Sequence, residues 1–318
     1  MDPQSSHTVR DRYLAIGAAV LTALIWSSSF VFVKMLLPEI GPFSIAGLRY
    51  FLGSLLLLPW VLPELPAMRQ INKRGWIMLL MLGISSYAIG NGVFFWALEY
   101  LPATTASFMM SLKPLLVLFA GIIFLKELPN KLQIIGILIS LSGSVFFFKD
   151  GLIGGQPLGL VIASVSIVGF TSFGILGRAL AREQQVGTLL RTAIPLAFGG
   201  GLMLLVAFPL EGIPHLSSRG WVLVLILAVV NTTLGYLLHN YAIRILYAFE
   251  MDIFLSLAPL GTAVLAWLLL GEIMQIHQIF GMFIVIIGVG IVQAASSRRK
   301  ENITGSDRIP FTVEEKTS

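Results

Sequence analysis

The sequence predicts an all-α polytopic membrane protein in which ten transmembrane helices form two inverted five-helix repeats. Three observations support this fold class. Of 318 residues, 56% are hydrophobic and only 12% are charged, whereas a soluble domain carries about 25% charged residues. Ten apolar segments follow one another, most near the ~20 residues that cross a bilayer. The last five segments also resemble the first five.

The ten segments are separated by short linkers rich in turn-forming residues, such as 38–42 and 63–66. Short linkers make neighbouring helices antiparallel. The first segment is long enough to span and lacks a small-residue cleavage pattern, so we expect it to stay in the membrane. The predicted segments are 13–37, 42–62, 75–98, 102–125, 131–149, 157–180, 187–208, 219–243, 246–270 and 274–296.

Lysine and arginine are distributed unequally between the two sides of this arrangement. If the N-terminus is inside, only Lys34, Lys149 and Arg219 fall in outside regions. The inside regions then hold Arg10, Arg12, Arg69, Lys73, Arg74, Lys126, Lys131, Arg178, Arg182, Arg244, Arg298, Arg299, Lys300, Arg308 and Lys316. Cytoplasmic loops carry such an excess. The sequence therefore predicts a plasma-membrane protein with a cytoplasmic N-terminal tail (1–12) and a cytoplasmic, disordered C-terminal tail (297–318).

An internal repeat relates the two halves. RGWIML begins at Arg74 and RGWVLV at Arg219, a shift of 145 residues. The same shift pairs Gly90 with Gly235, Ser111 with Ser256, Glu127 with Glu272 and Gly136 with Gly281. Matched glycine, glutamate and tryptophan at one shift are not expected from apolar composition alone.

The repeats are predicted to cover 13–149 and 157–296. Because each contains five helices, an odd number, the second begins on the opposite face of the membrane. Inverted repeats of this kind are typical of secondary transporters that hold substrate near the midplane and work by alternating access.

Four stretches of the apolar segments carry a recognisable pattern: ALIWSSSFVFVK (23–34), GLRYFLGSLLLLP (47–59), FFWALEYLPATTASFMMSLKPLLVLFAGIIFLKE (94–127) and LAPLGTAVLAWLLLGE (257–272). Together they resemble the EamA-type, ten-helix branch of the drug/metabolite transporter superfamily. The resemblance spans nearly all of 13–296. It implies a plasma-membrane carrier of small organic metabolites, often an exporter of amino acids or related compounds.

Lys113 is the foremost candidate for substrate binding. It lies in the middle of segment 102–125, where this family pattern usually has a small or polar residue. A lysine near the midplane is costly unless it faces a partner or water. Its repeat mate is Ala258, so the fold itself does not need a cation there. The alternative is a structural ion pair or a side chain that extends to one interface.

Further substrate-binding candidates are polar, aromatic or methionine residues at a similar depth. Buried amides and phenols either bond across helices or line a wet site, and methionine adapts to varied ligands. Close packing is the alternative reading for each. The candidates are Trp26, Ser28, Tyr87, Asn91, Met109, Asn231 and Tyr236.

His239, Glu250 and Asp252 form a candidate coupling group near the cytoplasmic side, with protons as the coupling ion. The two carboxylates begin the ninth segment, so the alternative is that they stabilise its positive N-terminal dipole. Arg49 and Arg191 are expected to extend to an interface or to pair with an anion. Glu127 and Glu272 end matched helices and are interpreted as structural.

Other functional classes find little support. The chain has no cysteine and four histidines, and no zinc, phosphate-loop or nucleophile-elbow motif is present. We therefore predict no catalytic residue, metal or cofactor, and no nucleic-acid partner. The expected partners are a small-molecule substrate and the lipid bilayer, and the protein is a monomer or homodimer. The function predicted is secondary transport of carboxylate-bearing metabolites, with a membrane enzyme or flippase acting on lipid-linked substrates as the alternative.

Overall fold

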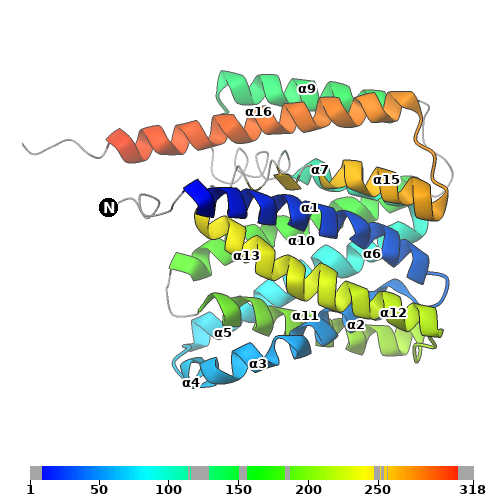
Figure 1. Ribbon diagram of the computed structural model, residues 1–318, viewed down its shortest axis with the longest axis vertical. Coiled ribbons are helices and arrows are strands. Elements are labelled where there is room, and N and C mark those ends of the chain that lie inside the picture. Colours follow the sequence, from blue (N-terminus) through cyan, green and yellow to red (C-terminus); the bar gives the residue numbers. More distant parts are fainter. Residues whose placement is uncertain are drawn as a thin grey trace, which may run out of the picture.

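The computed structural model describes residues 9–113, 115, 129–149, 156–182, 187–246, 251, 254–255 and 257–306. Every regular element in this part of the chain is a helix (Figure 1). This agrees with the predicted all-α class. Glu250 and Asp252 lie outside the described residues, as does Glu127.

The helices of the first half are α1 (Val9–Leu36), α2 (Pro42–Leu56), α3 (Leu58–Val61), η1 (Leu62–Glu64), α4 (Leu65–Met68), α5 (Lys73–Leu82), η2 (Gly83–Gly92), α6 (Val93–Tyr100), α7 (Ala103–Ser111) and α9 (Lys131–Phe147). Those of the second half are α10 (Gln156–Arg182), α11 (Thr188–Glu211), α12 (Ser218–Ile226), η3 (Leu227–Leu234), α13 (Gly235–Ile245), α15 (Ala258–Leu270) and α16 (Ile276–Ser306). Here η1 is a 3₁₀-helix, whereas η2 and η3 are π-helical.

Four described helices are long and apolar enough to cross a membrane: 10–36, 73–100, 189–211 and 218–242. A fifth crossing results if α2 and the helices to Met68 count as one span bent by 47°. Four shorter apolar helices cover 131–147, 156–172, 258–270 and 276–292. The protein is therefore a polytopic helical membrane protein. The count of ten crossings stays a prediction, because the fourth and ninth segments include residues outside the described part.

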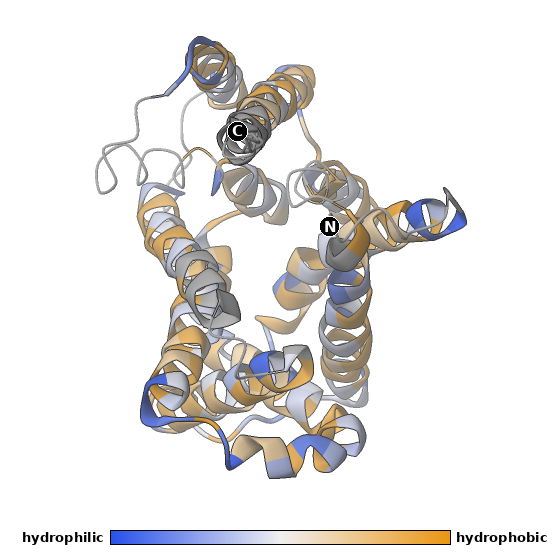
Figure 2. Ribbon diagram, turned by 90° about the vertical axis from the view of Figure 1, so that its left-hand side faces the viewer, coloured by the Kyte–Doolittle hydropathy of each residue, from blue (hydrophilic) through white to orange (hydrophobic). Residues whose placement is uncertain are grey.

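The surface is apolar in the way that a bilayer requires. Val145, Leu205 and Phe208 are among the large side chains that are at least 65% exposed. Figure 2 looks along the helices and shows hydrophobic residues over most of their length, with hydrophilic residues concentrated at helix ends and linkers. Such faces are stable in lipid because helices satisfy their own backbone groups.

Two helix pairs, each with one member from each repeat, flank the middle of the molecule. In Figure 1, α9 and α16 lie at one edge and α2 and α11 at the other, with α1, α10 and α13 between them. The helices α1 and α15 also pack together. Contacts between the repeats thus extend across the whole molecule.

The α9–α16 pair shows how the repeated glycines are used. A Cβ atom at Gly136 would lie 2.7 Å from the carbonyl oxygen of Gly288, and one at Gly143 would lie 2.7 Å from that of Gly281. The backbones can approach this closely only without side chains there. Since Gly136 and Gly281 are repeat mates, as are Gly143 and Gly288, the pairing is reciprocal. A two-fold axis between the two helices produces this pattern.

The C-terminal boundary differs from the prediction. Helix α16 continues to Ser306, ten residues beyond the predicted limit at 296, so the first part of the expected disordered tail is helical. No glycine or proline interrupts the stretch from 291 to 304. Without a helix breaker, a transmembrane helix can continue into polar sequence.

Candidate functional site

Two π-helical segments occupy matching places in the repeats. η2 and η3 interrupt the spans 73–100 and 218–242 near their middles. The wider π turn is frequent at functional sites. The Asn231 carbonyl in η3 accepts a hydrogen bond from Trp26 Nε1 at 3.0 Å, and the Gly90 carbonyl in η2 accepts one from Ser166 Oγ at 2.5 Å. Each π segment thus bonds to a helix of the other repeat.

An aromatic ring rests on a glycine beside each π segment. Trp26 of α1 lies against Gly235, where a Cβ atom would be 2.6 Å from its Nε1. Phe170 of α10 lies against Gly90, where a Cβ atom would be 3.0 Å from the ring. The two glycines are repeat mates, so the two contacts are equivalent. Only glycine lets the rings approach these helices so closely.

Arg49 corrects an expectation from the sequence. It is only 4% exposed, in the middle of α2, and does not extend to an interface. Its Nε donates to Thr232 Oγ1 at 2.9 Å, and its other nitrogens donate to Ser29 Oγ and to the Asn231 carbonyl. No carboxylate pairs with Arg49 among the described residues. Neutral oxygens from α1 and η3, two elements that α2 contacts, satisfy it instead.

Asn231 connects the same π segment to α1. Its Nδ2 donates to the Ile25 carbonyl at 2.5 Å and to Ser28 Oγ at 2.9 Å. The residue is fully buried, and its Oδ1 has no hydrogen-bond partner within the described part of the chain. Asn231 therefore joins the repeats through one end of its amide and keeps an acceptor at the other end.

Aromatic side chains form a continuous chain through the middle of the molecule. The ring centroids of Tyr50 and Tyr87 are 4.9 Å apart, and those of Tyr87 and Tyr236 are 6.2 Å apart. The phenols of Tyr87 and Tyr236 share a hydrogen bond. Trp26 then contacts Tyr236 at 5.6 Å and stacks on His239 at 5.3 Å. Arg49 lies over the Tyr50 ring at 5.0 Å, at the far end of this chain.

Lys113 contacts the ring that rests on Gly90. Its Nζ lies 5.6 Å from the centre of the Phe170 ring, a cation–π distance. At the Trp26 end of the aromatic chain, the Nδ1 atom of His239 is buried and has no hydrogen-bond partner in the described ranges. Lys113 therefore lies beside Phe170, and His239 leaves a polar ring atom beside Trp26.

We define the central cluster as Trp26, Ser28, Arg49, Tyr50, Tyr87, Asn231, Tyr236 and His239, with Lys113 and Phe170 beside it. Most of these residues differ from their repeat mates. At the shift of 145 residues, Lys113 corresponds to Ala258, Tyr236 to Asn91, His239 to Phe94 and Tyr87 to Thr232. The backbone positions of the cluster are therefore repeated in the two halves, whereas most of the side chains at those positions are not.

Two sequence candidates have other surroundings. The Nδ2 of Asn91 donates to the Ser86 carbonyl at 2.9 Å within its own π segment. Met109 packs against the main hydrophobic core, which includes Tyr50 and Tyr87 of the central cluster. The described hydrogen bond of Asn91 stays within η2 and does not reach that cluster. The described residues contain no group of three or more histidine, aspartate or glutamate residues that could hold a metal ion.

A family model matches the chain twice, at residues 13–149 and 157–293, and its family is the EamA-like transporter family. The chain belongs to this family. The first match has the bounds of the first predicted repeat, and the second ends three residues before the predicted limit at 296. The sequence-based recognition of the family is confirmed. The protein is a membrane transporter, and the family is one of transporters rather than enzymes, which answers the membrane-enzyme alternative.

Several relatives share this organisation. An "Uncharacterized transporter" of Archaeoglobus fulgidus is 28% identical over 86% of this chain and 95% of its own length. The "Uncharacterized transporter YyaM" of Bacillus subtilis is 25% identical over 91% and 96%. The "Uncharacterized inner membrane transporter YhbE" of Escherichia coli K12 is 27% identical over 78% and 79%.

One solved crystal structure shares the fold. It has a TM-score of 0.65 at 17% sequence identity and covers 90% of this chain and 98% of that chain. At this identity the similarity concerns the fold alone.

Sequence reasoning missed part of the cluster. Tyr50 was not among the candidates, nor was Phe170 beside the cluster, although they contact Tyr87 and Lys113. The Arg49 partners Ser29 and Thr232, outside the cluster as defined, were not predicted either. One available signal was Arg49 itself, a charged residue well inside an apolar segment. Another was the glycine-rich, polar stretch of η2. The remaining members have no pattern that separates them from ordinary packing residues.

Proposed function

We propose that the protein is a secondary transporter that works by alternating access, and that the central cluster is its substrate site. The observation that carries the proposal is the convergence of unrepeated aromatic and polar side chains from both repeats. Trp26 and Tyr87 come from the first repeat, and Asn231, Tyr236 and His239 come from the second. Substrate sites at a repeat interface are the rule for transporters with inverted repeats.

The chemistry of the cluster favours a small organic substrate with a carboxylate and an apolar part, such as an amino acid. The rings of Trp26 and Tyr236 offer apolar area. Asn231 Oδ1, an acceptor, and His239 Nδ1, which donates or accepts according to its tautomer, have no described partner and suit an ammonium or a hydroxyl. Lys113 offers a compact positive charge for the carboxylate. Export is the proposed direction, following the family resemblance.

A binding screen tests the substrate class first. A ligand that binds the native state raises its apparent melting temperature, so purified protein is heated with a panel of amino acids, other carboxylates and uncharged metabolites. Hits are then tested by counterflow in proteoliposomes. Saturable counterflow of carboxylate-bearing hits is expected. Binding only of lipid-linked compounds would instead favour a flippase.

Coupling to protons is proposed through His239, together with Glu250 and Asp252 from the sequence. Replacing both carboxylates by amides should abolish the pH dependence of transport while substrate binding persists. An unchanged pH profile with slightly lower thermal stability would assign the pair to helix capping instead.

Placement in the plasma membrane with both termini cytoplasmic is likewise proposed. It is supported by the lysine and arginine distribution and by the inner-membrane relative. Because the chain lacks cysteine, single cysteines label without background. A cysteine at Lys73 should react only from the cytoplasm, and one at Ile213 only from outside. Reaction of the Lys73 position from outside would invert the topology.

A further inference from the structure

Three glutamates at one end of the molecule each cap a helix of the other repeat. Glu39 accepts bonds from the Ser217 N–H and hydroxyl at 2.9 Å, at the start of α12. Glu211 accepts from the N–H groups of Phe43 and Ser44 at 2.9 and 2.8 Å, at the start of α2. We call this end, defined by Glu39, Glu211 and Glu272, the capped end.

Glu272 makes the third cap. Its carboxylate accepts from the Ala103 N–H at 2.8 Å and from the Thr104 N–H and hydroxyl at 3.1 and 3.0 Å, at the start of α7. The same corner is held by Lys34 of α1, which donates to the carbonyls of Leu98 and Leu101 at 2.5 and 2.7 Å. A cation at the end of α6 and a carboxylate at the start of α7 both match the helix dipoles.

The three caps differ in what surrounds them. Glu211 joins α11 to α2, two helices that pack closely along their length: a Cβ atom at Gly200 would overlap the Phe51 backbone, and one at Gly47 would lie 2.7 Å from Leu204. That cap lies within a rigid pair. Glu39 and Glu272 instead join helices that pack together less extensively than α2 and α11, namely α1 with the α12–α13 span and the end of α15 with α7.

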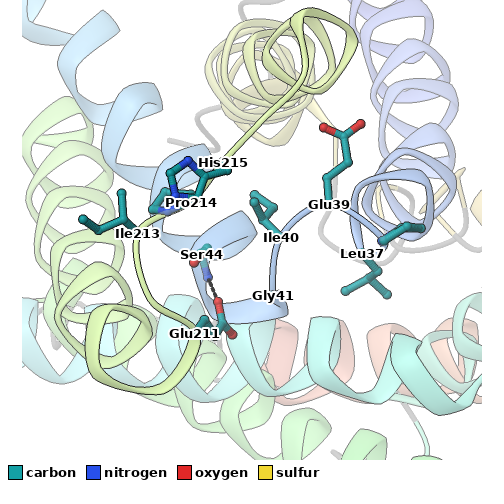
Figure 3. Close-up of a pocket in the computed structure, with 10 residues that line it drawn as sticks. Leu37, Glu39, Ile40, Gly41, Ser44, Glu211, Ile213, Pro214 and His215 are labelled. Atoms are coloured by element: carbon teal, nitrogen blue, oxygen red, sulfur yellow. Dashed lines mark hydrogen bonds between the residues drawn. The ribbon is translucent and has the colours of Figure 1, made fainter.

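The Glu39 cap is also accessible to water. A cavity of about 310 Å³ lies between the α1–α2 and α11–α12 linkers and is lined by Glu39, Glu211, Ser44 and His215, among others. Figure 3 shows Glu211 reaching Ser44 on one side and Glu39 on the other side of this opening. The bonds of Glu39 to Ser217 are exposed, whereas those of Glu211 to Phe43 and Ser44 are partly buried. Water can therefore replace the cap bonds of Glu39 when the helix ends separate. A contact that water can replace suits a reversible closure.

We infer that Glu39 and Glu272 are the latch of a gate that closes the capped end of the transporter, whereas Glu211 is architectural. The inference rests on the proposed alternating access, since only then must the helices around the central cluster separate at this end. Closure places two carboxylates on the N-termini of α12 and α7. Opening exchanges these bonds for water and leaves the α2–α11 pair intact.

Spin-label distances test the latch without a known substrate. One label pair is placed at Trp96 on α6 and Val222 on α12, across the capped end. A second pair, at Lys73 on α5 and Tyr241 on α13, spans the opposite end. The four positions are exposed, and the absence of native cysteine allows specific labelling. Distances are measured in lipid nanodiscs for the wild type and for Glu39→Gln/Glu272→Gln.

In the double variant, the population of molecules with a long distance at the capped end should increase relative to the population with a short distance. We expect this ratio of populations to rise at least about fivefold, because each cap loses a charged acceptor. Glu211→Gln is the matched control and should keep the wild-type distribution. Gly220→Ala is a second test that leaves every charge in place. Its methyl group would overlap the Glu39 carboxylate, so we expect it to weaken the same cap as Glu39→Gln. This variant tests the latch even if the double variant folds poorly.

The outcomes separate the two proposals. Unchanged capped-end distances in both Glu39→Gln/Glu272→Gln and Gly220→Ala overturn the latch, as does an equal shift in Glu211→Gln. Separation at the capped end with a shorter distance at the opposite end supports both the latch and alternating access. Separation at the capped end with no change at the opposite end supports the latch and overturns alternating access.

Discussion

The capped end and the central cluster use polar residues in opposite ways. At the capped end, Glu272 has a repeat mate in Glu127. Glu211 lies beside Gly41, and in the other half of the chain Glu64 lies beside Gly187 in the same way. These residues serve helix ends, which every copy of the repeat possesses. In the central cluster, Lys113, Tyr236 and His239 have unlike mates. Repeated polar residues therefore bind helix ends, and unrepeated ones are candidates for substrate recognition.

Substitution of Arg49 should have the largest effect on stability, and it tests whether a polar residue of the central cluster can serve structure rather than substrate recognition. It lies in the central cluster, yet neutral acceptors on two other helices already satisfy it. Arg49→Ala should lower the free energy of unfolding by about 3 kcal/mol, since hydrogen bonds to a charged group are each worth about 1.5–3 kcal/mol. Thermal melts in detergent check this. Normal stability with lost substrate binding would instead place Arg49 among the recognition residues.

Lys113 should show the reverse behaviour. Lys113→Ala is expected to weaken binding of carboxylate-bearing substrates about 30-fold, close to 2 kcal/mol, with a nearly unchanged melting temperature because Ala258 fills the equivalent position. Lys113→Arg should be partly tolerated, since a planar fork replaces a compact charge. Binding is measured by calorimetry, and Lys149→Ala controls for the loss of one positive charge. Wild-type affinity in Lys113→Ala would assign the lysine a structural role.

Substitution of Tyr236 should have a smaller effect, which combines a modest loss of stability with weaker binding of some substrates. Tyr236→Phe removes the hydrogen bond with Tyr87 but keeps the ring beside Trp26. The expected loss of stability is about 1 kcal/mol, and substrates that need a polar contact should bind more weakly while apolar contacts persist. Tyr241→Phe, on the exposed face of α13, is the control and should have no effect. Equal effects of the two substitutions would contradict a special role for the Tyr87–Tyr236 pair.

The sequence predicted the frame better than the site because the two depend on different signals. Periodic apolar segments, positive charges and a fixed 145-residue shift are long patterns, and the shift even pairs the glycines that bring α9 and α16 together. Trp26, Tyr87, Asn231, Tyr236 and His239 became candidates because they are polar or aromatic interruptions of apolar helices. Asn91 became a candidate by the same rule, yet its amide bonds to the backbone of its own π segment. Arg49 was misjudged because its three acceptors come from helices distant in sequence, which no local pattern reveals.

Substitution of Glu211 should have the smallest effect on stability and, unlike substitutions in the central cluster, no effect on transport. Glu211→Gln keeps an acceptor for the α2 N-terminus but removes the charge that complements its dipole, so the loss of stability should be about 0.5 kcal/mol. Because α2 and α11 stay packed through Gly47 and Gly200, transport and substrate affinity should match those of the wild type. Melting curves and counterflow rates measured on the same preparation check both halves of the prediction. A transport defect without a stability defect would mean that the α2–α11 pair also moves during transport, and Glu211 would then belong to the latch together with Glu39 and Glu272.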